Sequence, residues 1–165
     1  MKRKPVLIVS ASQRSKTSDT LLQKSLSSMS SHNSVVGKQY KLQMHVQNRK
    51  PLPELYNEYL TKDQQKHHDI ILFVHDDVYI DDLGCFDKLY SSIFNYGNDI
   101  VGLAGATQAI IKKPALWHLM SEKKYHSGHV AHINDKDDTM HTTSCGSYPK
   151  RCLLLDGLFL GVNIS

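Results

Sequence analysis

The sequence lacks a segment long enough to cross a membrane and lacks the cysteine pattern of a secreted or zinc-stabilised domain. Its longest apolar stretches lie around Val6–Val9, Ile70–Val74 and Leu153–Leu160, and none approaches the ~20 residues that a spanning helix needs. The basic start is followed by an apolar run too short for a signal peptide. The three cysteines show no C-x-x-C spacing, so neither a disulfide framework nor a structural zinc site is expected. We therefore expect a cytoplasmic protein without a transmembrane segment.

Glycine-rich phosphate loops and concentrated basic charge are also missing. Neither Gly-x-Gly-x-x-Gly nor Gly-x-x-x-x-Gly-Lys-Ser/Thr occurs, which disfavours a dinucleotide enzyme and a P-loop NTPase. Twenty Lys and Arg against 16 Asp and Glu give a net charge of +4, and beyond Lys2–Lys4 the basic residues are scattered. Because nucleic-acid binders gather their charge into a patch or stripe, no nucleic-acid partner is expected. The 165 residues are 40% apolar and 22% charged, as in an ordinary globular domain.

Strand-like and helix-like segments alternate over the first hundred residues. Val6–Val9 predicts a buried parallel strand, the period-two pattern of Tyr40–Val46 a half-buried strand, and Asp69–His75 a central strand that is apolar on both faces. A further short strand is predicted at Ile100–Gly105. Residues Asn134–Tyr148 read as a long polar loop.

Three helices are expected between these strands. The first is capped by Ser18 or Asp19, and its serine-rich tail over Ser27–Ser34 is expected to fray. The other two span Glu54–Leu60 and the residues from Leu83 to near Gly97. This order favours an α/β fold of three layers, α/β/α, with a mostly parallel, Rossmann-like central sheet.

Sheets of this kind bind ligands at the carboxyl ends of their strands. The candidate segments are therefore Ser10–Ser12, Gln47–Arg49, His75–Asp77 and Gly105–Thr107. The imidazole and two carboxylates of His75–Asp77 follow the most apolar strand and suit a hard divalent cation such as Mg²⁺ or Mn²⁺. The alternative is a helix cap, a role that Asp81 or Asp82 fills better than Asp76 and Asp77 do.

Histidine is abundant, and half of the ten histidines crowd into the last third of the chain, at His118, His126, His129, His132 and His141. The spacing of three between His126, His129 and His132 would place them on one face of a helix. Ser127, Gly128 and the β-branched neighbours favour a strand or loop instead, on which they would alternate faces. A metal ligand among them, with His129 or His132 as a third ligand, stays open beside the interpretation that none binds metal.

Several of these segments together resemble a known family. They are Ser10-Ala-Ser12, the run from Asn48 to Asn57, the strand that ends in His75-Asp-Asp77, Ile100–Gly105, Ala115–Trp117, and Leu155–Leu160. In order and spacing they resemble the nucleotide-diphospho-sugar glycosyltransferases of the GT-A fold, closest to a family 2-like branch with His-x-Asp in place of Asp-x-Asp. The resemblance runs roughly from residue 6 to residue 162.

The resemblance implies a role for individual residues. His75 and Asp77 would hold the metal, Mn²⁺ or Mg²⁺. Ser10, Ala11, Ser12, Asn48 and Asp76 would meet the donor nucleotide, with Tyr56 and Asn57 supporting the pocket. Trp117 and Gly157 would lie on the sugar or acceptor side, and Asp156 would be the catalytic base. For Trp117, an aromatic filler at the edge of the core is an equal alternative.

The implied activity is transfer of a sugar from a UDP- or GDP-type donor to a saccharide or other hydroxyl acceptor, with inversion. Residues 1–165 would form one GT-A-like domain, with a donor-binding half at about 1–106 and a partial acceptor side at about 107–165. The C-terminal part is shorter than is usual in the family, so a non-catalytic nucleotide-sugar-binding module on the same fold is the alternative. An exposed strand edge in Leu153–Ile164 would favour a homodimer. A different Mg²⁺-dependent enzyme, a nucleotidyltransferase or a phosphatase-like Rossmannoid, is a third possibility; for the phosphatases, the expected Asp-x-Asp after the first strand is replaced by Ser10-Ala-Ser12.

Overall fold

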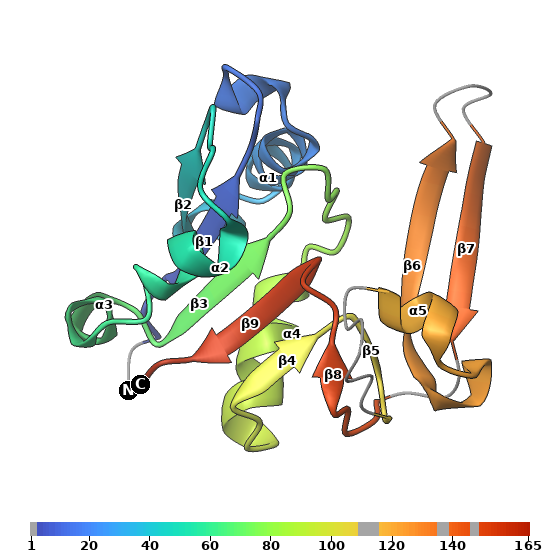
Figure 1. The fold of residues 1–165 in the computed structure, drawn as a ribbon. Helices are drawn as coiled ribbons and strands as arrows, with labels where there is room; N and C mark the ends of the chain where they lie inside the picture. The colour runs from blue at the N-terminus through green and yellow to red at the C-terminus, as the bar shows by residue number, and fades with distance from the viewer. Residues whose placement is uncertain (1–2, 109–115, 135–138, 146–148) are drawn as a thin grey trace. The chain divides into compact units, whose positions relative to one another are not determined.

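The computed structural model describes residues 3–108, 116–134, 139–145 and 149–165. The chain divides into two compact units, a first unit of Met1–Val101 with Leu160–Ser165 and a second unit of Gly102–Phe159. Across the described ranges, no helix combines the length and the apolar character needed to cross a membrane. Figure 1 shows the fold.

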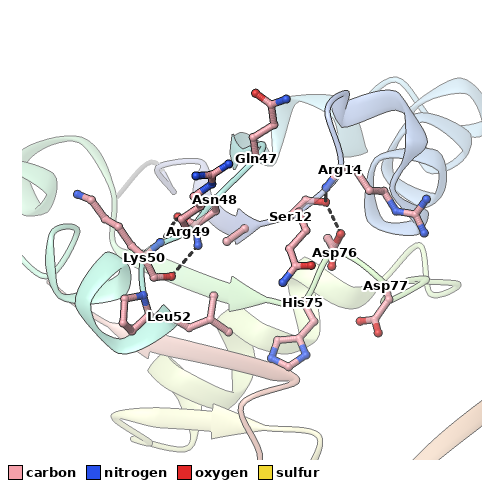
Figure 2. A pocket seen from close by; sticks show the side chains of 13 residues that line it. Ser12, Arg14, Gln47, Asn48, Arg49, Lys50, Leu52, His75, Asp76 and Asp77 are labelled. Atoms are coloured by element: carbon pink, nitrogen blue, oxygen red, sulfur yellow. Dashed lines mark hydrogen bonds between the residues drawn. The ribbon is translucent and has the colours of Figure 1, made fainter.

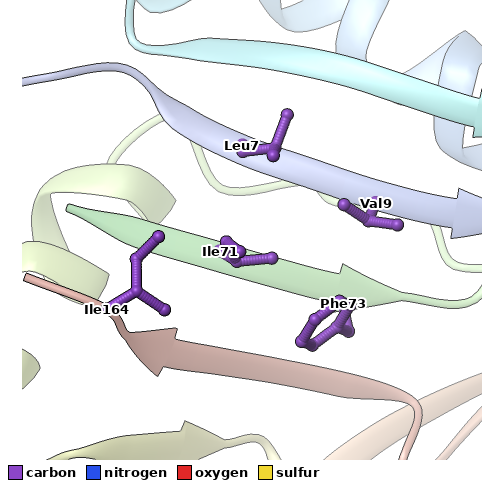
Figure 3. Packing of buried hydrophobic residues seen from close by; sticks show 5 residues of the cluster. All are labelled: Leu7, Val9, Ile71, Phe73 and Ile164. Atoms are coloured by element: carbon purple, nitrogen blue, oxygen red, sulfur yellow. The ribbon is translucent and has the colours of Figure 1, made fainter. Parts of the chain in front are cut away.

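A five-stranded mixed sheet organises the first unit and confirms the α/β class. Its strand order is β2-β1-β3-β9-β4, with β1 at Val6–Ala11, β2 at Tyr40–His45, β3 at Ile70–Val74, β9 at Phe159–Asn163 and β4 at Ile100–Gly102. Strand β1 pairs in parallel with both β2 and β3, whereas β9 runs the opposite way (Figure 3). The most apolar strand, β3, is central, as its sequence predicts, and all its residues are buried.

Helices cover both faces of this sheet. On one face, Leu7, Val9, Ile71, Phe73 and Ile164 form a buried cluster, shown in Figure 3. Tyr56 of α2, at Leu52–Asn57, packs against this cluster.

On the other face, the ring of Tyr40 stacks on Phe86 of α4, at Cys85–Tyr90, with 5.3 Å between centroids. The Tyr40 hydroxyl donates to the carbonyl of Leu26, in α1 at Leu21–His32, at 3.2 Å. The two faces together give the first unit three layers.

Helix α1 begins and ends later than its sequence predicts. Ser18 and Asp19 belong to a 3-10 turn, Thr17–Asp19, and the cap is Thr20, whose hydroxyl accepts from the Gln23 amide at 3.2 Å. The serine-rich tail is helical through His32, and its hydroxyls donate to carbonyls of the preceding turn. The bonds from Ser30 to Leu26 and from Ser31 to Ser27 show this.

The other helical segments of the first unit are short. They comprise the 3-10 turn Val36–Lys38, α3 at Lys62–His67, and a π-helical turn at Ser91–Asn95 that continues α4. Helix α2 ends three residues before the predicted Leu60, whose side chain is 47% exposed. At α4 the cap position is Gly84, and Asp82 contributes by accepting from the Gly84 amide at 2.9 Å.

The second unit is built on a four-stranded sheet of order β7-β6-β5-β8. Its strands are β5 at Ala104–Ala106, β6 at His126–Asn134, β7 at Thr139–Cys145 and β8 at Leu154–Leu155. Helix α5 spans Trp117–Met120, and a 3-10 turn spans Lys123–Tyr125. All described pairings in this sheet are antiparallel.

Two sequence predictions are wrong here. The expected strand Ile100–Gly105 is interrupted at Leu103 and contributes to both sheets as β4 and β5. The expected loop Asn134–Tyr148 contains β7, which is held by cross-strand pairing with β6 rather than by a local pattern. Its residues 135–138 and 146–148 lie outside the described part.

The expected strand edge at the end of the chain has a mixed outcome. Strand β9 lies between β3 and β4, so both of its edges are paired, and Ile164 is 8% exposed within the core. Strand β8, in the same segment, is the last strand of the second sheet and pairs with β5 alone among the described residues, so a homodimer stays a prediction.

Candidate functional site

A cleft of about 1410 Å³ opens at the carboxyl ends of β1, β2 and β3, entirely within the first unit. It is lined by residues 11–14 after β1, 47–52 after β2, and 75–77 after β3. These three loops lie at the same edge because the three strands are parallel. Most of the side chains drawn in Figure 2 are polar or charged.

Backbone hydrogen bonds join the first two loops of the cleft. The Ser12 amide donates to the His45 carbonyl at 2.8 Å, and the Asn48 amide donates to the Ser12 carbonyl at 2.9 Å. Between them, Gln47 adopts a left-handed conformation with φ of 52°, which is costly for a residue with a side chain. The Gln47 amide donates to the Arg14 carbonyl at 2.9 Å, so the loop after β1 holds this strained residue in place.

Asp76 is tied to the first loop, whereas its two neighbours are not. Ser12, which is 3% exposed, donates its hydroxyl to Asp76 at 2.5 Å and accepts from the Arg14 amide at 3.0 Å. Figure 2 shows the Asp76 side chain turned toward Ser12, with His75 and Asp77 pointing away from it. Asp77 is exposed and His75 half-buried. The spacing His-x-Asp thus leaves an imidazole and a carboxylate open to the cleft.

Cationic side chains come from the first two loops. Lys50 forms an ion pair with Glu58 at 2.6 Å, and this bond raises the pKa of the lysine. Arg14 and Arg49 are exposed, and no carboxylate within the described ranges pairs with either of them. Their guanidinium groups are therefore available to an anion in the cleft.

The amide of Asn48 serves the loop itself. Its nitrogen donates to the Lys50 carbonyl at 2.8 Å and its oxygen accepts from the Lys50 amide at 3.3 Å. Asn48 lines the cleft as predicted, but its side chain is occupied in shaping the turn.

Two buried hydroxyls near the strand ends have no hydrogen-bond partner among the described residues, those of Ser10 and Tyr56. The Tyr56 ring stacks on Phe73 with 4.3 Å between centroids. Burial, and secondarily the charge of Asp76, raise the pKa of Tyr56 to about 12. The phenol therefore stays protonated and can act as a hydrogen-bond donor. Buried polar atoms are normally paired, but neither Ser10 nor Tyr56 is among the residues that line the cleft.

A metal ion at His75 and Asp77 would need ligands from elsewhere. Within the described ranges, no group of three or more His, Cys, Asp or Glu side chains is placed to hold one. The pair nevertheless suits a cation that brings its other ligands with it, since Mg²⁺ is commonly held by one or two carboxylates together with substrate phosphates. His129 and His132 lie on β6 of the second unit, and their role as a third ligand stays a prediction.

The residues expected on the acceptor side come together in the second unit. The Trp117 indole N–H donates to Asp156 Oδ2 at 2.8 Å, and the Leu158 amide donates to Asp156 Oδ1 at 2.9 Å. Trp117 is 6% exposed and meets the ring of His126 edge-on at 5.0 Å. This burial favours packing over an open stacking platform for Trp117. Gly157 is exposed in the turn that follows Asp156.

The cleft contains most of the donor-side residues that the sequence predicts: Ala11, Ser12, Asn48, His75, Asp76 and Asp77. Ser10 lies buried within β1, and Gly105–Thr107 begins in β5 of the second sheet. Sequence reasoning missed Arg14 and Lys50, although both follow strand ends within a few residues. Their positive charge beside a predicted phosphate site was the available signal.

A scan against protein-family models finds no match for this chain, and a search of the curated proteins finds none either. The case for a function therefore depends on the cleft and on the chemistry of its side chains.

Proposed function

We propose that this chain is a glycosyltransferase that transfers a sugar from a nucleotide-diphosphate donor to a hydroxyl acceptor with the help of a divalent metal ion. One observation carries the proposal: a cleft at the carboxyl ends of three parallel strands combines two arginines, which pair with no carboxylate of the described residues, with an open imidazole and carboxylate. This edge is where open α/β sheets bind their ligands.

The charges of the cleft support a diphosphate as the ligand. Arg14 and Arg49 present planar guanidinium groups, which pair well with phosphate oxygens. His75 and Asp77 offer one nitrogen and one oxygen ligand to Mn²⁺ or Mg²⁺, and the phosphates supply further oxygens. A site with only cations or only carboxylates would bind a phosphate group or a metal, but not the two together.

The nucleoside part has uncharged partners in the same cleft. Gln13 and Gln47 line it with amide side chains that can donate and accept. Asn48 contributes by holding the loop after β2 in shape.

In the proposed reaction, the acceptor hydroxyl oxygen forms a bond to the anomeric carbon while the bond from that carbon to the donor phosphate oxygen breaks. The nucleoside diphosphate leaves with the electron pair, and the acceptor proton passes to a carboxylate base. When bound, the metal neutralises the charge that develops on the leaving diphosphate. The arginines stabilise the same charge. That Asp156 is the base stays a prediction.

Nucleotide binding tests the proposal. We expect UDP or GDP to bind by calorimetry in the presence of Mn²⁺, and Asp77→Ala to lower that metal-dependent affinity by at least tenfold. Asp81→Ala is the matched control, because Asp81 is an exposed carboxylate four residues away that does not line the cleft. If the wild-type chain binds no nucleoside diphosphate with or without Mn²⁺, the proposal is wrong.

Turnover separates the enzyme from a non-catalytic module. The wild-type protein, given Mn²⁺, a set of nucleotide sugars and a set of saccharide acceptors, is expected to release nucleoside diphosphate. Tight donor binding without release for every pair would favour the nucleotide-sugar-binding module. Asp156→Asn is expected to abolish release while leaving donor affinity unchanged.

A further inference from the structure

A second, smaller pocket of the first unit opens at the amino ends of β1 and β2, the opposite ends of these strands from the cleft. It holds about 90 Å³ and is lined by residues 3–5 before β1, residues 38–39 before β2, and three residues of α4. The parallel register brings the first two segments together, and the Val6 amide donates to the Gln39 carbonyl at 2.8 Å. This pocket is therefore separate from the proposed nucleotide site.

Three basic side chains and one carboxylate line the pocket: Arg3, Lys4, Lys38 and Asp87. Arg3 forms an ion pair with Asp87 at 2.6 Å, and its guanidinium lies 5.0 Å from the centroid of the Tyr90 ring. The ion pair uses the Nη1 nitrogen, and a guanidinium carries several further N–H donors. Arg3 is thus held in place with donors left for a ligand.

The two lysines differ in how they are bonded. Lys4 Nζ donates to the Gln65 carbonyl at 2.9 Å and pairs with Asp69 at 3.1 Å. Lys38 is exposed at the end of the 3-10 turn Val36–Lys38, and no carboxylate of the described ranges pairs with it. An anion in the pocket would supply the counter-charge that Lys38 lacks.

Gln39, another lining residue, has an acceptor without a donor. Its side chain is half-buried, and its oxygen Oε1 is buried with no hydrogen-bond partner among the described residues. Buried polar atoms are normally paired, so a ligand donor in the pocket that Gln39 lines would satisfy this oxygen. The ligand that fits both features carries negative charge and at least one O–H group.

We propose that this pocket binds inorganic phosphate. Its volume of about 90 Å³ lies well below the ~300 Å³ at which pockets for drug-sized ligands begin, so it suits a single small oxyanion. Phosphate keeps an O–H group at neutral pH that can donate to Gln39, while its other oxygens accept from Arg3 and Lys38. Sulfate has no proton at this pH and would leave the Gln39 oxygen unpaired. The argument is independent of the cleft and of the proposed function.

The test measures binding of inorganic phosphate by calorimetry in a metal-free chloride buffer of constant ionic strength. Because Arg14 and Arg49 also offer cations to phosphate in the cleft, the parent protein is the full chain with Arg14→Gln and Arg49→Gln. We expect Lys38→Gln in this parent to lower phosphate affinity by roughly fivefold, the upper end for an exposed ion pair.

Lys41→Gln is the matched control, because Lys41 is an exposed lysine three residues away that does not line the pocket. Its phosphate affinity should equal that of the parent. Lys38 is exposed and pairs with no carboxylate of the described residues, so Lys38→Gln should leave the fold intact, as circular dichroism would verify.

Sulfate tests the role of the Gln39 oxygen. We expect the parent to bind phosphate roughly tenfold more tightly than sulfate, since sulfate leaves a buried acceptor unpaired. Gln39→Met, which keeps the length of the side chain and removes the amide, should lose that preference. The Gln39 side-chain amide resonances of the parent should also shift on addition of phosphate, a nuclear magnetic resonance readout that needs no substitution at Gln39. The proposal is overturned if the parent binds no phosphate, if Lys38→Gln binds it as tightly as the parent does, or if sulfate binds as tightly as phosphate.

Discussion

Asp77 in the first unit and Asp156 in the second both follow the end of a strand, yet their carboxylates are bonded differently. Asp156 accepts from the Trp117 indole at 2.8 Å and from the Leu158 amide at 2.9 Å, one bond to each oxygen. Asp77 is exposed at the cleft and makes no hydrogen bond or ion pair within the described ranges. Asp76 is an intermediate case, because its carboxylate accepts a hydrogen bond from the Ser12 hydroxyl.

This difference in hydrogen bonding indicates that Asp156 contributes to stability and Asp77 to ligand binding. A polar group satisfied by its own chain contributes to folding, and removing its partner leaves an unmade bond at a cost of ~1–3 kcal/mol. A charged group left open contributes little to folding and can bind a ligand. Substitutions around Asp156 should therefore change the free energy of unfolding, and substitutions in the cleft should change ligand affinity.

The largest expected effect is that of Trp117→Ala. Because Trp117 is 6% exposed and bonded to Asp156, the variant should lose roughly 3–5 kcal/mol of unfolding free energy, as truncations of buried aromatics do. Trp117 is the only tryptophan, so urea unfolding is followed by circular dichroism rather than by fluorescence. Trp117→Phe keeps most of the ring and should lose about 1.5–3 kcal/mol, the range of a hydrogen bond to a charged group. Equal stability of all three proteins would contradict the role given to this bond.

Removing the cleft arginines should lower ligand affinity and leave the free energy of unfolding nearly unchanged. Arg14→Gln with Arg49→Gln should weaken UDP or GDP binding by tenfold or more, since each charge-assisted bond is worth about 1.5–3 kcal/mol. Unfolding free energy should stay within about 0.5 kcal/mol, as for other surface substitutions. Arg151→Gln, exposed in the second unit, serves as the control in calorimetry and urea unfolding. A large loss of stability without loss of affinity would contradict the assignment of these arginines to ligand binding.

Ser12→Ala should affect both stability and binding, because Ser12 lines the cleft and also donates a hydrogen bond to Asp76. Its loss leaves Asp76 without its hydroxyl partner and the Arg14 amide without its acceptor, for a cost of about 1–3 kcal/mol in unfolding free energy. Nucleotide affinity should fall by less than in the double arginine variant. Ser18→Ala, at an exposed position, is expected to change neither quantity, and an effect as large as that of Ser12→Ala would argue against the Asp76 link.

The parts of the fold that follow a local pattern are predictable from the sequence. The alternation of Tyr40–His45 and the continuous apolar run of Ile70–Val74 each specify a strand and its exposure. The grouping of Ser12, Asn48 and His75 at one edge then follows, because parallel strands end together.

The parts that depend on distant partners are not predictable in this way. Strand β7 has no local signal and exists through its pairing with β6. The interior place of β9 is a matter of topology that no periodicity encodes. In the site, the division between tied Asp76 and open Asp77 depends on Ser12, 64 residues from Asp76 in the sequence.

The last expected effect is on the pH dependence of stability and is confined to alkaline solution. Burial raises the pKa of Tyr56 from 10.0 in the unfolded chain to about 12 in the fold. The unfolded phenol therefore loses its proton first, so the stabilisation is complete below pH 10 and is lost as the pH rises toward 12.

Urea unfolding followed by circular dichroism between pH 9 and 12 should show a shallower decline for Tyr56→Phe than for the wild type. Some decline should remain in the variant, because burial also raises the pKa of Cys85 and of Tyr90 to about 12. Tyr96→Phe is the control, since that side chain is 77% exposed and should leave the wild-type slope unchanged. Identical slopes for Tyr56→Phe and wild type would mean that the Tyr56 hydroxyl is open to water, which would contradict the burial that raises its pKa.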